Sequence, residues 1–408
     1  MKPWRTTMYR IGNSEVTAVR EAIKSGRLFR YANMTGAKEQ SRVEAFESGW
    51  EKFTGSAHCL STTSGTSSLI CSLTALGIGP GDEVIVPGYT YIATALAVLK
   101  AGAIPVIAEI DESCTLDPKS LAELAGPRTK AVIPVHMMGM PCDMDSILRV
   151  SREKNLYVLE DACQAAGGTY KGKILGTLGD MGVFSFNFYK IIASGEGGAL
   201  ITNNRKLYER AFMEHDGGGA LWPDNDDIKA PFFAGGNSRN SEISGAILLE
   251  QLKRLPGILS DLRMVHRTLS GLLEPPGPVH IAPSRDTEGD CGIQTTLLTD
   301  DTVSMRKLLN LLGEAGVEAD SPVDSDRHLF YNWDPILSQR GAAHPLMNPY
   351  KMPANAECRL DYPEDMLPRT RDIVSRTIMI RHNIDWSEKD VMKTAEKINR
   401  CIQKAAAS

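Results

Sequence analysis

Short apolar runs alternate with helical patterns between about residues 57 and 202, and each run ends in a turn rich in Gly, Pro or polar residues. The runs predict strands over 57–60, 83–86, 104–107, 131–135 and 156–159, and the patterns between them predict helices over 66–76, 92–101 and 144–154. Continuous apolar strands separated by helices indicate a mainly parallel sheet that is buried on both faces. Ligands of such sheets bind at the carboxyl ends of the strands.

The pattern changes in the second half of the chain. A helix predicted over 241–255 is followed by Pro256-Gly257, which interrupts the helical pattern. Shorter strands then alternate with helices over 302–315 and 387–405, and the last of these begins Ser-Glu-Lys-Asp, as a capped helix does. We therefore predict a large α/β domain over 1–255, with an N-terminal helix over 14–25, and a smaller α+β domain over 256–408.

Composition narrows the class of protein but not its chemistry. The chain has 408 residues, of which 42% are hydrophobic and 23% charged, as is typical of a soluble globular protein. A formal charge of -5 gives no general electrostatic reason to expect nucleic acid or an anionic membrane as a partner. The N-terminus lacks the apolar core of a secretory signal, and Lys100 and Pro105 interrupt the longest apolar stretch, so we expect a cytoplasmic protein. Eight cysteines without a CxxC pair predict reduced thiols, with neither a disulfide framework nor a metal site.

Lys190 and Asp161 are the main candidates for chemistry. Lys190 lies between an apolar stretch and the glycine turn 195–198. Partly apolar surroundings favour the neutral, nucleophilic form of an amine, which can condense with a carbonyl. Asp161 ends an apolar strand, with Glu160 directed to the other face. On local sequence alone Asp161 could equally cap a helix, but together with Lys190 it suggests an acid that pairs with the ring nitrogen of pyridoxal phosphate.

A Ser/Thr/Gly segment, 62–68, lies between a strand and an apolar helix, where backbone N–H groups and the helix dipole favour a phosphate group. The same pattern also occurs as a plain capping motif. Ser185 could add a hydroxyl, Tyr91 could stack on a flat ring or simply pack, and Cys163 and Gln164 follow Asp161 closely enough to reach the same ring. The segment is no P-loop, and the glycine turn at 195–198 lacks dinucleotide-loop spacing.

Together these motifs resemble the DegT/DnrJ/EryC1/StrS family of sugar aminotransferases, which are pyridoxal-phosphate enzymes of fold type I. The similarity runs from roughly residue 10 to the C-terminus. It is carried by the segments 64–66, 86–94, 134–136, 160–164, 185–190, 195–198 and 236–239. The resemblance implies a large, mainly parallel sheet of the seven-stranded type that binds the cofactor, followed by a smaller α+β domain.

The resemblance also implies roles for individual residues. Lys190 would be the Schiff-base lysine and Asp161 the partner of the ring nitrogen, while Gln164 would bond near the ring hydroxyl and Tyr91 would stack on the ring. The phosphate would be held by Gly65, Thr66 and Ser185, and by Asn237 from the neighbouring subunit. A homodimer with a shared active site follows. The departures from the family pattern, at Ser238, Asn240 and Arg381, put the acceptor site in doubt rather than the cofactor site.

Within the family, the segments 29–31, 331–333 and 372–378 resemble the branch that aminates 8-oxo-3-deoxy-octulosonate to the 8-amino-3,8-dideoxy sugar. Other branches act on nucleotide-linked keto-sugars or keto-cyclitols. Arg239, Arg327 and His328 are candidates for meeting an anionic acceptor, although each could equally be a solvated surface residue.

The resemblance implies a transamination in two halves. An amino donor, L-glutamate, would convert the cofactor to pyridoxamine 5'-phosphate, which would then aminate a keto-sugar or a similar carbonyl compound. Two alternatives are a dehydratase of the same fold, in which a histidine replaces the lysine, and a cofactor-binding sensor without turnover.

Overall fold

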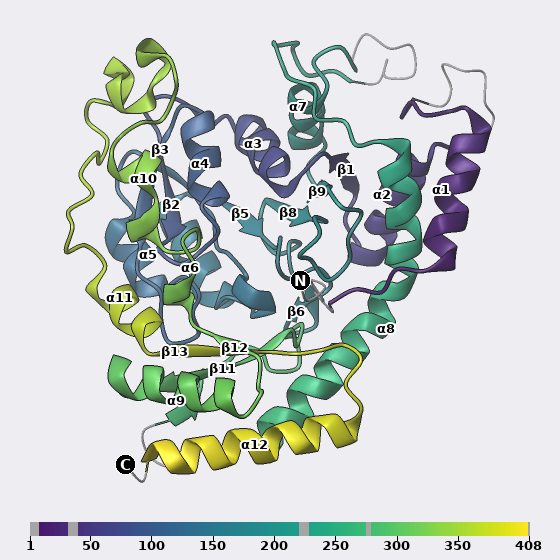
Figure 1. The fold of residues 1–408 in the computed structure, drawn as a ribbon. Coiled ribbons are helices and arrows are strands. Elements are labelled where there is room, and N and C mark those ends of the chain that lie inside the picture. The colour runs from purple at the N-terminus through teal and green to yellow at the C-terminus, as the bar shows by residue number, and fades with distance from the viewer. Residues whose placement is uncertain (1–7, 32–39, 220–227, 275–278, 407–408) are drawn as a thin grey trace.

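The computed structural model describes residues 8–31, 40–219, 228–274 and 279–406. At its centre lies a seven-stranded sheet with the strand order β1-β9-β8-β5-β4-β2-β3 (Figure 1). Its strands are β1 (His58–Thr62), β2 (Glu83–Pro87), β3 (Ile104–Ala108), β4 (Thr129–Val132), β5 (Tyr157–Asp161), β8 (Met181–Ser185) and β9 (Gly198–Thr202). All neighbouring pairs are parallel except those that β9 makes with β1 and β8. The predicted α/β fold with a mainly parallel seven-stranded sheet is confirmed.

The strands are apolar throughout because both faces of the sheet are covered. Val84 and Val86 belong to the core cluster on one face, whereas Ile85 between them belongs to the cluster on the other. The first face is covered by α3 (Gly65–Leu76), α4 (Ala93–Lys100) and α7 (Arg205–His215). The second is covered by α2 (Arg42–Thr54), α5 (Pro118–Leu124), α6 (Met144–Lys154) and the first half of α8 (Glu242–Leu272). A short hairpin, β6 (Thr169–Tyr170) and β7 (Lys173–Ile174), follows β5.

The long helix α8 connects the two parts of the molecule. In Figure 1 it runs from beside α1 (Asn13–Ser25) and α2 down to the lower layer. The sequence predicts a helix end at Pro256-Gly257, and this prediction is wrong, because the helix continues to Leu272 with Pro256 inside it. A proline removes one backbone hydrogen bond, and burial of Leu255 and Leu259 on either side of it offsets that loss.

The lower layer contains a second, antiparallel sheet with the order β10-β11-β13-β12. Its strands are β10 (Val279–Ile281), β11 (Gln294–Thr299), β12 (Ala319–Asp320) and β13 (Thr377–Arg381), and α9 (Thr302–Glu314) and α12 (Glu388–Ala406) pack on it. The capped start of α12 is confirmed, because the backbone N–H of Asp390 bonds to the Ser387 hydroxyl and the Asp390 carboxylate accepts from the Ser387 N–H.

Between β12 and β13 the chain returns to the large sheet. This stretch contains α10 (Asp334–Leu337), α11 (Pro368–Ser375) and several short 3₁₀ turns. Phe330, Trp333 and Val374 are buried in the same core cluster as β2 and α4. The division into domains at 255/256 therefore stays a prediction, since part of the second segment packs on the first.

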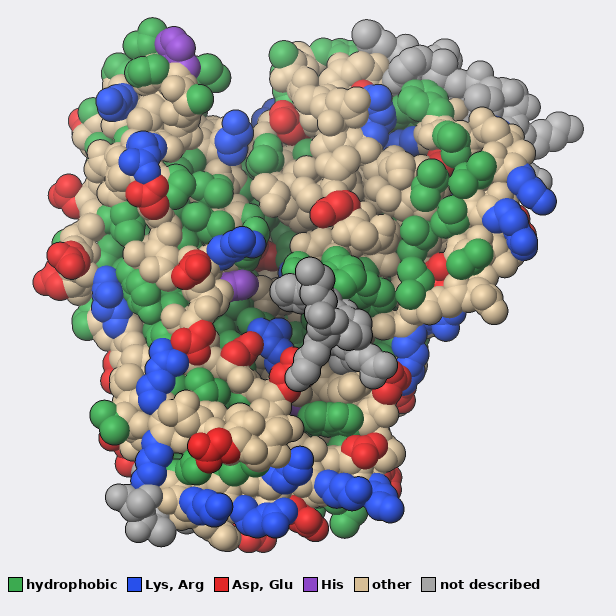
Figure 2. Space-filling model, in the orientation of Figure 1, with side chains coloured by type: hydrophobic (Ala, Val, Ile, Leu, Met, Phe, Trp, Pro, Cys, Tyr) green, Lys and Arg blue, Asp and Glu red, His purple; other side chains and the backbone are tan. Residues whose placement is uncertain are grey.

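The surface view in Figure 2 shows Lys and Arg side chains interspersed with Asp and Glu on this face. In the described part of the chain, no helix combines the length and the apolar character needed to cross a membrane. Each of the eight cysteines is a free thiol in the structure.

Candidate active site

Three loops meet at the carboxyl ends of β1, β5 and β8. Gly65 begins α3 after a two-residue turn that follows β1, and it lies against Cys163 after β5 and Ser185 at the end of β8. A Cβ atom on Gly65 would come within 2.7 Å of the Cys163 sulfur and 2.9 Å of the Ser185 Cβ. Gly198, on β9, also lies close to this turn, since a Cβ atom added there would come within 2.4 Å of the Ser64 backbone. The loops therefore approach each other more closely than side chains at these glycines would permit.

Asp161 is the last residue of β5 and is buried, as predicted for a residue at the carboxyl end of this strand. Both of its carboxylate oxygens accept hydrogen bonds: Oδ1 from the backbone N–H of Cys163, at 3.1 Å, and Oδ2 from the Thr94 hydroxyl, at 3.0 Å. Its backbone is fixed by bonds to Pro134 and His136. The carboxylate thus has one orientation, which leaves its remaining lone pairs for a further donor.

Glu160 points to the opposite face, as predicted, and its buried carboxylate accepts hydrogen bonds from the backbone N–H groups of Gly176, Leu178 and Gly179 at 2.6 to 2.8 Å. It also pairs with His136 at 3.1 Å. Glu160 therefore stabilises the loop after β7, and this role separates it from its neighbour Asp161.

Lys190 lies in a tight turn after β8. The backbone N–H of Lys190 donates to the Asn187 carbonyl, and Asn187 and Gly195 form an isolated bridge that closes the turn. Burial lowers the pKa of the Lys190 amine, while the charges of Cys163 and Asp161 act in the opposite direction. Among the described residues the amine forms no hydrogen bond or ion pair. This direction favours the neutral form of the amine, and Asp161 is one of the charged groups that act on Lys190.

The start of α3 offers free hydrogen-bond donors. The Ser64 hydroxyl caps the helix by accepting the Ser67 N–H at 3.1 Å. In the described part of the chain, the N–H groups of Gly65 and Thr66 have no acceptor, as expected for the first turn of a helix. Ser185 is buried beside them. An anion at this point would meet two backbone donors, a hydroxyl and the positive end of the helix dipole.

Gln164 and Tyr91 are the two remaining residues expected to contact the ring. The Gln164 side-chain oxygen accepts the backbone N–H of Met138 at 3.2 Å, so its amide N–H groups are left for another partner. Met138 adopts a left-handed backbone conformation, with φ 52°, in the turn between β4 and α6. Tyr91 is half-exposed before α4, and its ring centre lies 5.5 Å from that of His328.

The three candidate substrate residues differ in their surroundings. His328 lies near Lys190: burial lowers its pKa to about 4, and the positive charges of Lys190, Arg381 and Arg327 add to the effect. Arg327 is exposed at the same loop. Arg239, in contrast, forms an ion pair with Asp216 at 2.7 Å. Of the three side chains, only that of Arg239 is already neutralised by a carboxylate.

Asn237, the expected contribution of a second subunit, is exposed, and its side-chain oxygen accepts the Arg239 N–H at 3.4 Å. Sequence reasoning missed two residues that contact the site, Thr94 and Met138. The i, i+4 spacing of the Thr90 and Thr94 hydroxyls could have indicated Thr94. No local pattern indicates Met138, because its backbone N–H reaches Gln164 only through the tertiary fold.

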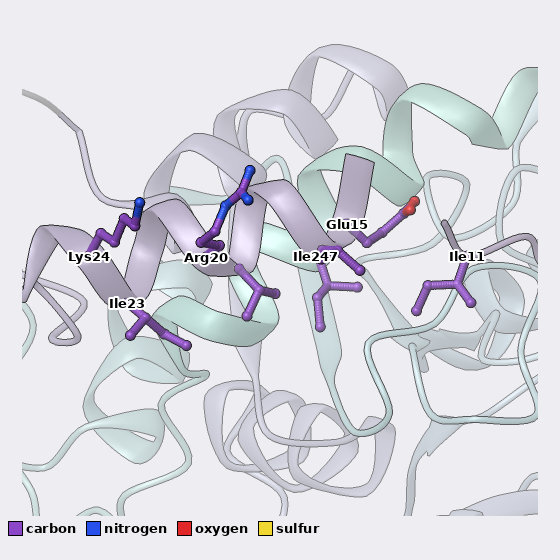
Figure 3. Close-up of a pocket in the computed structure, with 8 residues that line it drawn as sticks. Ile11, Glu15, Arg20, Ile23, Lys24 and Ile247 are labelled. Atoms are coloured by element: carbon purple, nitrogen blue, oxygen red, sulfur yellow. The ribbon is translucent and has the colours of Figure 1, made fainter. Parts of the chain in front are cut away.

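Within the described ranges, no group of three or more His, Cys, Asp and Glu side chains could hold a metal ion. A cavity of about 550 Å³ lies between α1 and α8, and Figure 3 shows lining residues from both helices. Its lining is mainly aliphatic, formed by Ile11, Val16, Val19, Ile23 and Ile247, and Glu15, Arg20 and Lys24 also line it.

Known proteins resemble the chain along most of its length. Residues 10–329 match the model of the DegT/DnrJ/EryC1/StrS aminotransferase family. GDP-perosamine synthase of Caulobacter vibrioides is 44% identical over 216 residues, which make up 52% of this chain and 57% of that protein. An L-glutamine:2-deoxy-scyllo-inosose aminotransferase of Micromonospora echinospora is 31% identical over 397 residues, or 93% of this chain and 91% of that one. In three of the curated relatives, the matching stretch spans only 55% to 62% of the relative's length.

Solved structures show the same fold. The crystal structure of 3-amino-5-hydroxybenzoic acid synthase matches with a TM-score of 0.77 at 28% identity, covering 97% of both chains. A GDP-4-keto-6-deoxymannose-3-dehydratase matches with a TM-score of 0.78 at 21% identity, covering 96% of this chain and 98% of the other. At that identity the second similarity concerns the fold alone.

Proposed function

The chain belongs to the DegT/DnrJ/EryC1/StrS aminotransferase family, and we propose that it transfers an amino group from L-glutamate to a keto-sugar or a similar carbonyl compound, with pyridoxal 5'-phosphate as cofactor. One observation carries the proposal: an amine with a lowered pKa, Lys190, shares its surroundings with a buried carboxylate, Asp161, at the carboxyl end of the sheet. The names of the relatives, which include a perosamine synthase and an aminotransferase for an inosose, support a sugar-like acceptor.

The residues present fit the cofactor. The close approach at Gly65 leaves no room for a side chain between α3 and Ser185, and the free donors there suit a phosphate dianion. The Gly65 and Thr66 N–H groups and the Ser185 hydroxyl would hold the phosphate, together with Asn237 of the partner subunit. Tyr91 would cover the ring. These assignments follow the family pattern, and the donor set around Gly65 agrees with them.

Other residues would hold the reactive part of the cofactor. Cys163, whose backbone N–H donates to Asp161, would border the ring, and Gln164 would donate an amide N–H to the ring hydroxyl. Pyridoxal phosphate supplies an electron sink for negative charge that forms at the substrate carbon. The Asp161 carboxylate would hold the proton on the ring nitrogen, which would keep that sink effective. Its fixed orientation, with a donor on each oxygen, is suited to this task.

Lys190 has two tasks in the proposed reaction. Its amine would bind the cofactor aldehyde, and Nζ, once free, would move a proton between the α-carbon of the donor and C4′ of the cofactor. Both tasks require the unprotonated amine, and burial favours that form. A dehydratase of the same fold uses a histidine in place of this lysine in the resembling enzymes, so Lys190 favours amino transfer.

His328 and Arg327 remain candidates for the acceptor, since both lie on the loop near Lys190. Arg239 is a weaker candidate because Asp216 already pairs with it. The octulosonate branch resemblance is carried in part by Arg30 and Trp333, which are buried in this structure. Those residues support the packing of the chain and give no information about the acceptor.

A homodimer with a shared site is part of the proposal. The surface around α1 supports it, because Ile11 before the helix and Val16 and Ile23 within it are each more than half exposed and line the cavity between α1 and α8 (Figure 3). Clusters of exposed aliphatic side chains are unusual on a monomer. Light scattering on the purified protein measures the mass directly, and a monomeric mass across the micromolar range would contradict this part of the proposal.

The proposed amino transfer is tested through its first half-reaction, in which the amino donor reacts without an acceptor. Purified protein loaded with pyridoxal phosphate and mixed with L-glutamate, without an acceptor, should release one 2-oxoglutarate per site and lose its visible absorbance band. Addition of a suitable keto-sugar should restore the band, and nucleotide-linked keto-sugars, keto-octulosonate and keto-cyclitols form the acceptor screen. L-glutamine in a parallel reaction distinguishes the donor. A band that no amino donor changes would favour a sensor and refute the aminotransferase.

A further inference from the structure

A chain of hydroxyl groups leads to the carboxylate of Asp161. The Thr94 hydroxyl lies 3.0 Å from Asp161 Oδ2, and the Thr90 hydroxyl lies 3.0 Å from that of Thr94. Both threonines are about 1% exposed. The three side chains come from two elements, since Thr90 and Thr94 flank the start of α4 and Asp161 ends β5.

The direction of this chain follows from the donor and acceptor properties of its members. An ionised carboxylate only accepts hydrogen bonds, so the Thr94 hydroxyl must donate its proton to Asp161. Having used its one proton, Thr94 can only accept from Thr90. The order is therefore Thr90 to Thr94 to Asp161, and each hydrogen bond in such a row polarises the next.

Neither hydroxyl serves the ordinary purpose of a threonine at a helix start. The N-terminus of α4 has no side-chain cap, and Ile92 occupies the N-cap position. A threonine inside a helix often bonds to the carbonyl one turn earlier, but Thr94 bonds to the Thr90 hydroxyl and to Asp161 instead. Both buried hydroxyls have a hydrogen-bond partner, which offsets the free-energy cost of removing them from water.

We propose that Thr94 is the positioning residue for Asp161, and that Thr90 completes the row by holding the Thr94 hydroxyl in its donating orientation. This inference rests on the proposed function, because it concerns how Asp161 meets the cofactor ring. Asp161 receives the Cys163 backbone N–H on Oδ1 and the Thr94 hydroxyl on Oδ2, so Thr94 is the side-chain donor that holds the second oxygen. The Cys163 thiol also forms a hydrogen bond with this carboxylate.

The row also extends to the loop that carries His328. The Thr90 backbone N–H donates to the His328 carbonyl at 3.0 Å. Between the same two segments, the Phe330 backbone N–H donates to the Gly88 carbonyl. Tyr89 and Leu329 form an antiparallel bridge between these segments. The same backbone hydrogen bonds therefore hold both Thr90 and the loop that carries His328. Because Thr90 is bonded to Asp161 through Thr94, this loop is also held relative to Asp161.

The experiment compares variants of the loaded protein by cofactor affinity and by spectrum. Thr94→Val keeps the side-chain shape but leaves Asp161 Oδ2 without its donor. We expect the dissociation constant for pyridoxal phosphate to increase about 10-fold to 100-fold, as for the loss of a hydrogen bond to a charged group. In Thr94→Val the carboxylate of Asp161 is no longer held in its orientation toward the ring nitrogen. In a spectral titration of the bound cofactor, the ring nitrogen of this variant should therefore lose its proton at lower pH than in the wild type. Thr94→Ser retains the hydroxyl and should restore both properties.

Thr90→Val removes an equally buried hydroxyl that acts on Asp161 only through Thr94. We expect it to shift the titration in the same direction as Thr94→Val, but less. The proposal is overturned if the spectral titrations of Thr94→Val and the wild type coincide, or if Thr90→Val shifts the titration more than Thr94→Val does. If Thr94→Val does not fold, Thr94→Ala enters the same comparison. A wild-type protein that binds no pyridoxal phosphate would instead refute the proposed function itself.

Discussion

Substitution of Gly65 tests whether the close approach of the three loops builds the phosphate site. In Gly65→Ala the new Cβ would lie 2.7 Å from the Cys163 sulfur and 2.9 Å from the Ser185 Cβ, about 1 Å inside normal contact distances. Both neighbours are short side chains at the ends of strands and have little freedom to move. Overpacking of this kind typically costs about 1 to 3 kcal/mol.

The same displacement should affect the cofactor more than the fold. A shift of α3 by roughly 1 Å would move the Gly65 and Thr66 N–H groups away from Ser185, so we expect the affinity for pyridoxal phosphate to fall by about 100-fold. Urea denaturation measures the free energy of unfolding, and a titration followed by absorbance measures the affinity. Wild-type affinity and stability in Gly65→Ala would refute the reasoning.

Two further variants make the comparison specific. Gly257→Ala lies in α8, where a new Cβ meets no atom within 4 Å, so it should stabilise the protein by about 0.5 to 1 kcal/mol and leave cofactor binding unchanged. Combining Gly65→Ala with Cys163→Ala removes the nearer of the two contacts but not the contact with Ser185. That double variant should recover part of the lost affinity.

Three other predictions follow from charged groups. Lys190→Ala should bind the cofactor without a covalent bond and lose several orders of magnitude in turnover, measured by release of 2-oxoglutarate, and near-normal turnover would exclude its role. The pKa of Lys190 is lowered in the folded chain, so at pH values between that pKa and the ordinary value of 10.5 the unfolded chain holds a proton that the folded chain has lost. The free energy of unfolding of the cofactor-free protein should therefore increase with pH in this range. The variant Lys190→Ala should lack this increase. Arg30→Met removes a buried partner that contacts both Glu47 oxygens, at 2.5 and 2.8 Å, and should cost about 3 to 5 kcal/mol in urea denaturation, whereas Arg306→Met, at an exposed ion pair with Asp324, should cost at most about 1 kcal/mol.

The pattern of apolar residues predicted the central sheet well because its strands are buried on both faces. The strand at 156–159 differs from β5 by only one or two residues at each end, and the helix at 144–154 matches α6 at both ends. The end of α8 could not be predicted in this way. Pro256 interrupts the local pattern, but packing of residues far along the chain decides that the helix continues.

The site shows the same division between local and tertiary information. The positions of Asp161 and Gly65 follow from their places after strands, since parallel strands bring their carboxyl ends to one edge. The contacts of Thr94 with Asp161 and of Met138 with Gln164 join elements that are 67 and 26 residues apart. The pairing of Arg239 with Asp216, which weakens its candidacy as a substrate residue, is likewise set by tertiary packing.

The central claim is that the amine of Lys190 binds the cofactor aldehyde. Borohydride reduction of the loaded protein fixes such a bond permanently, and mass spectrometry of the proteolytic fragments then locates the added mass. We predict that a single peptide carries it, with the modification on Lys190. Modification of a different lysine, or no modification in a protein that retains the cofactor, would contradict the account.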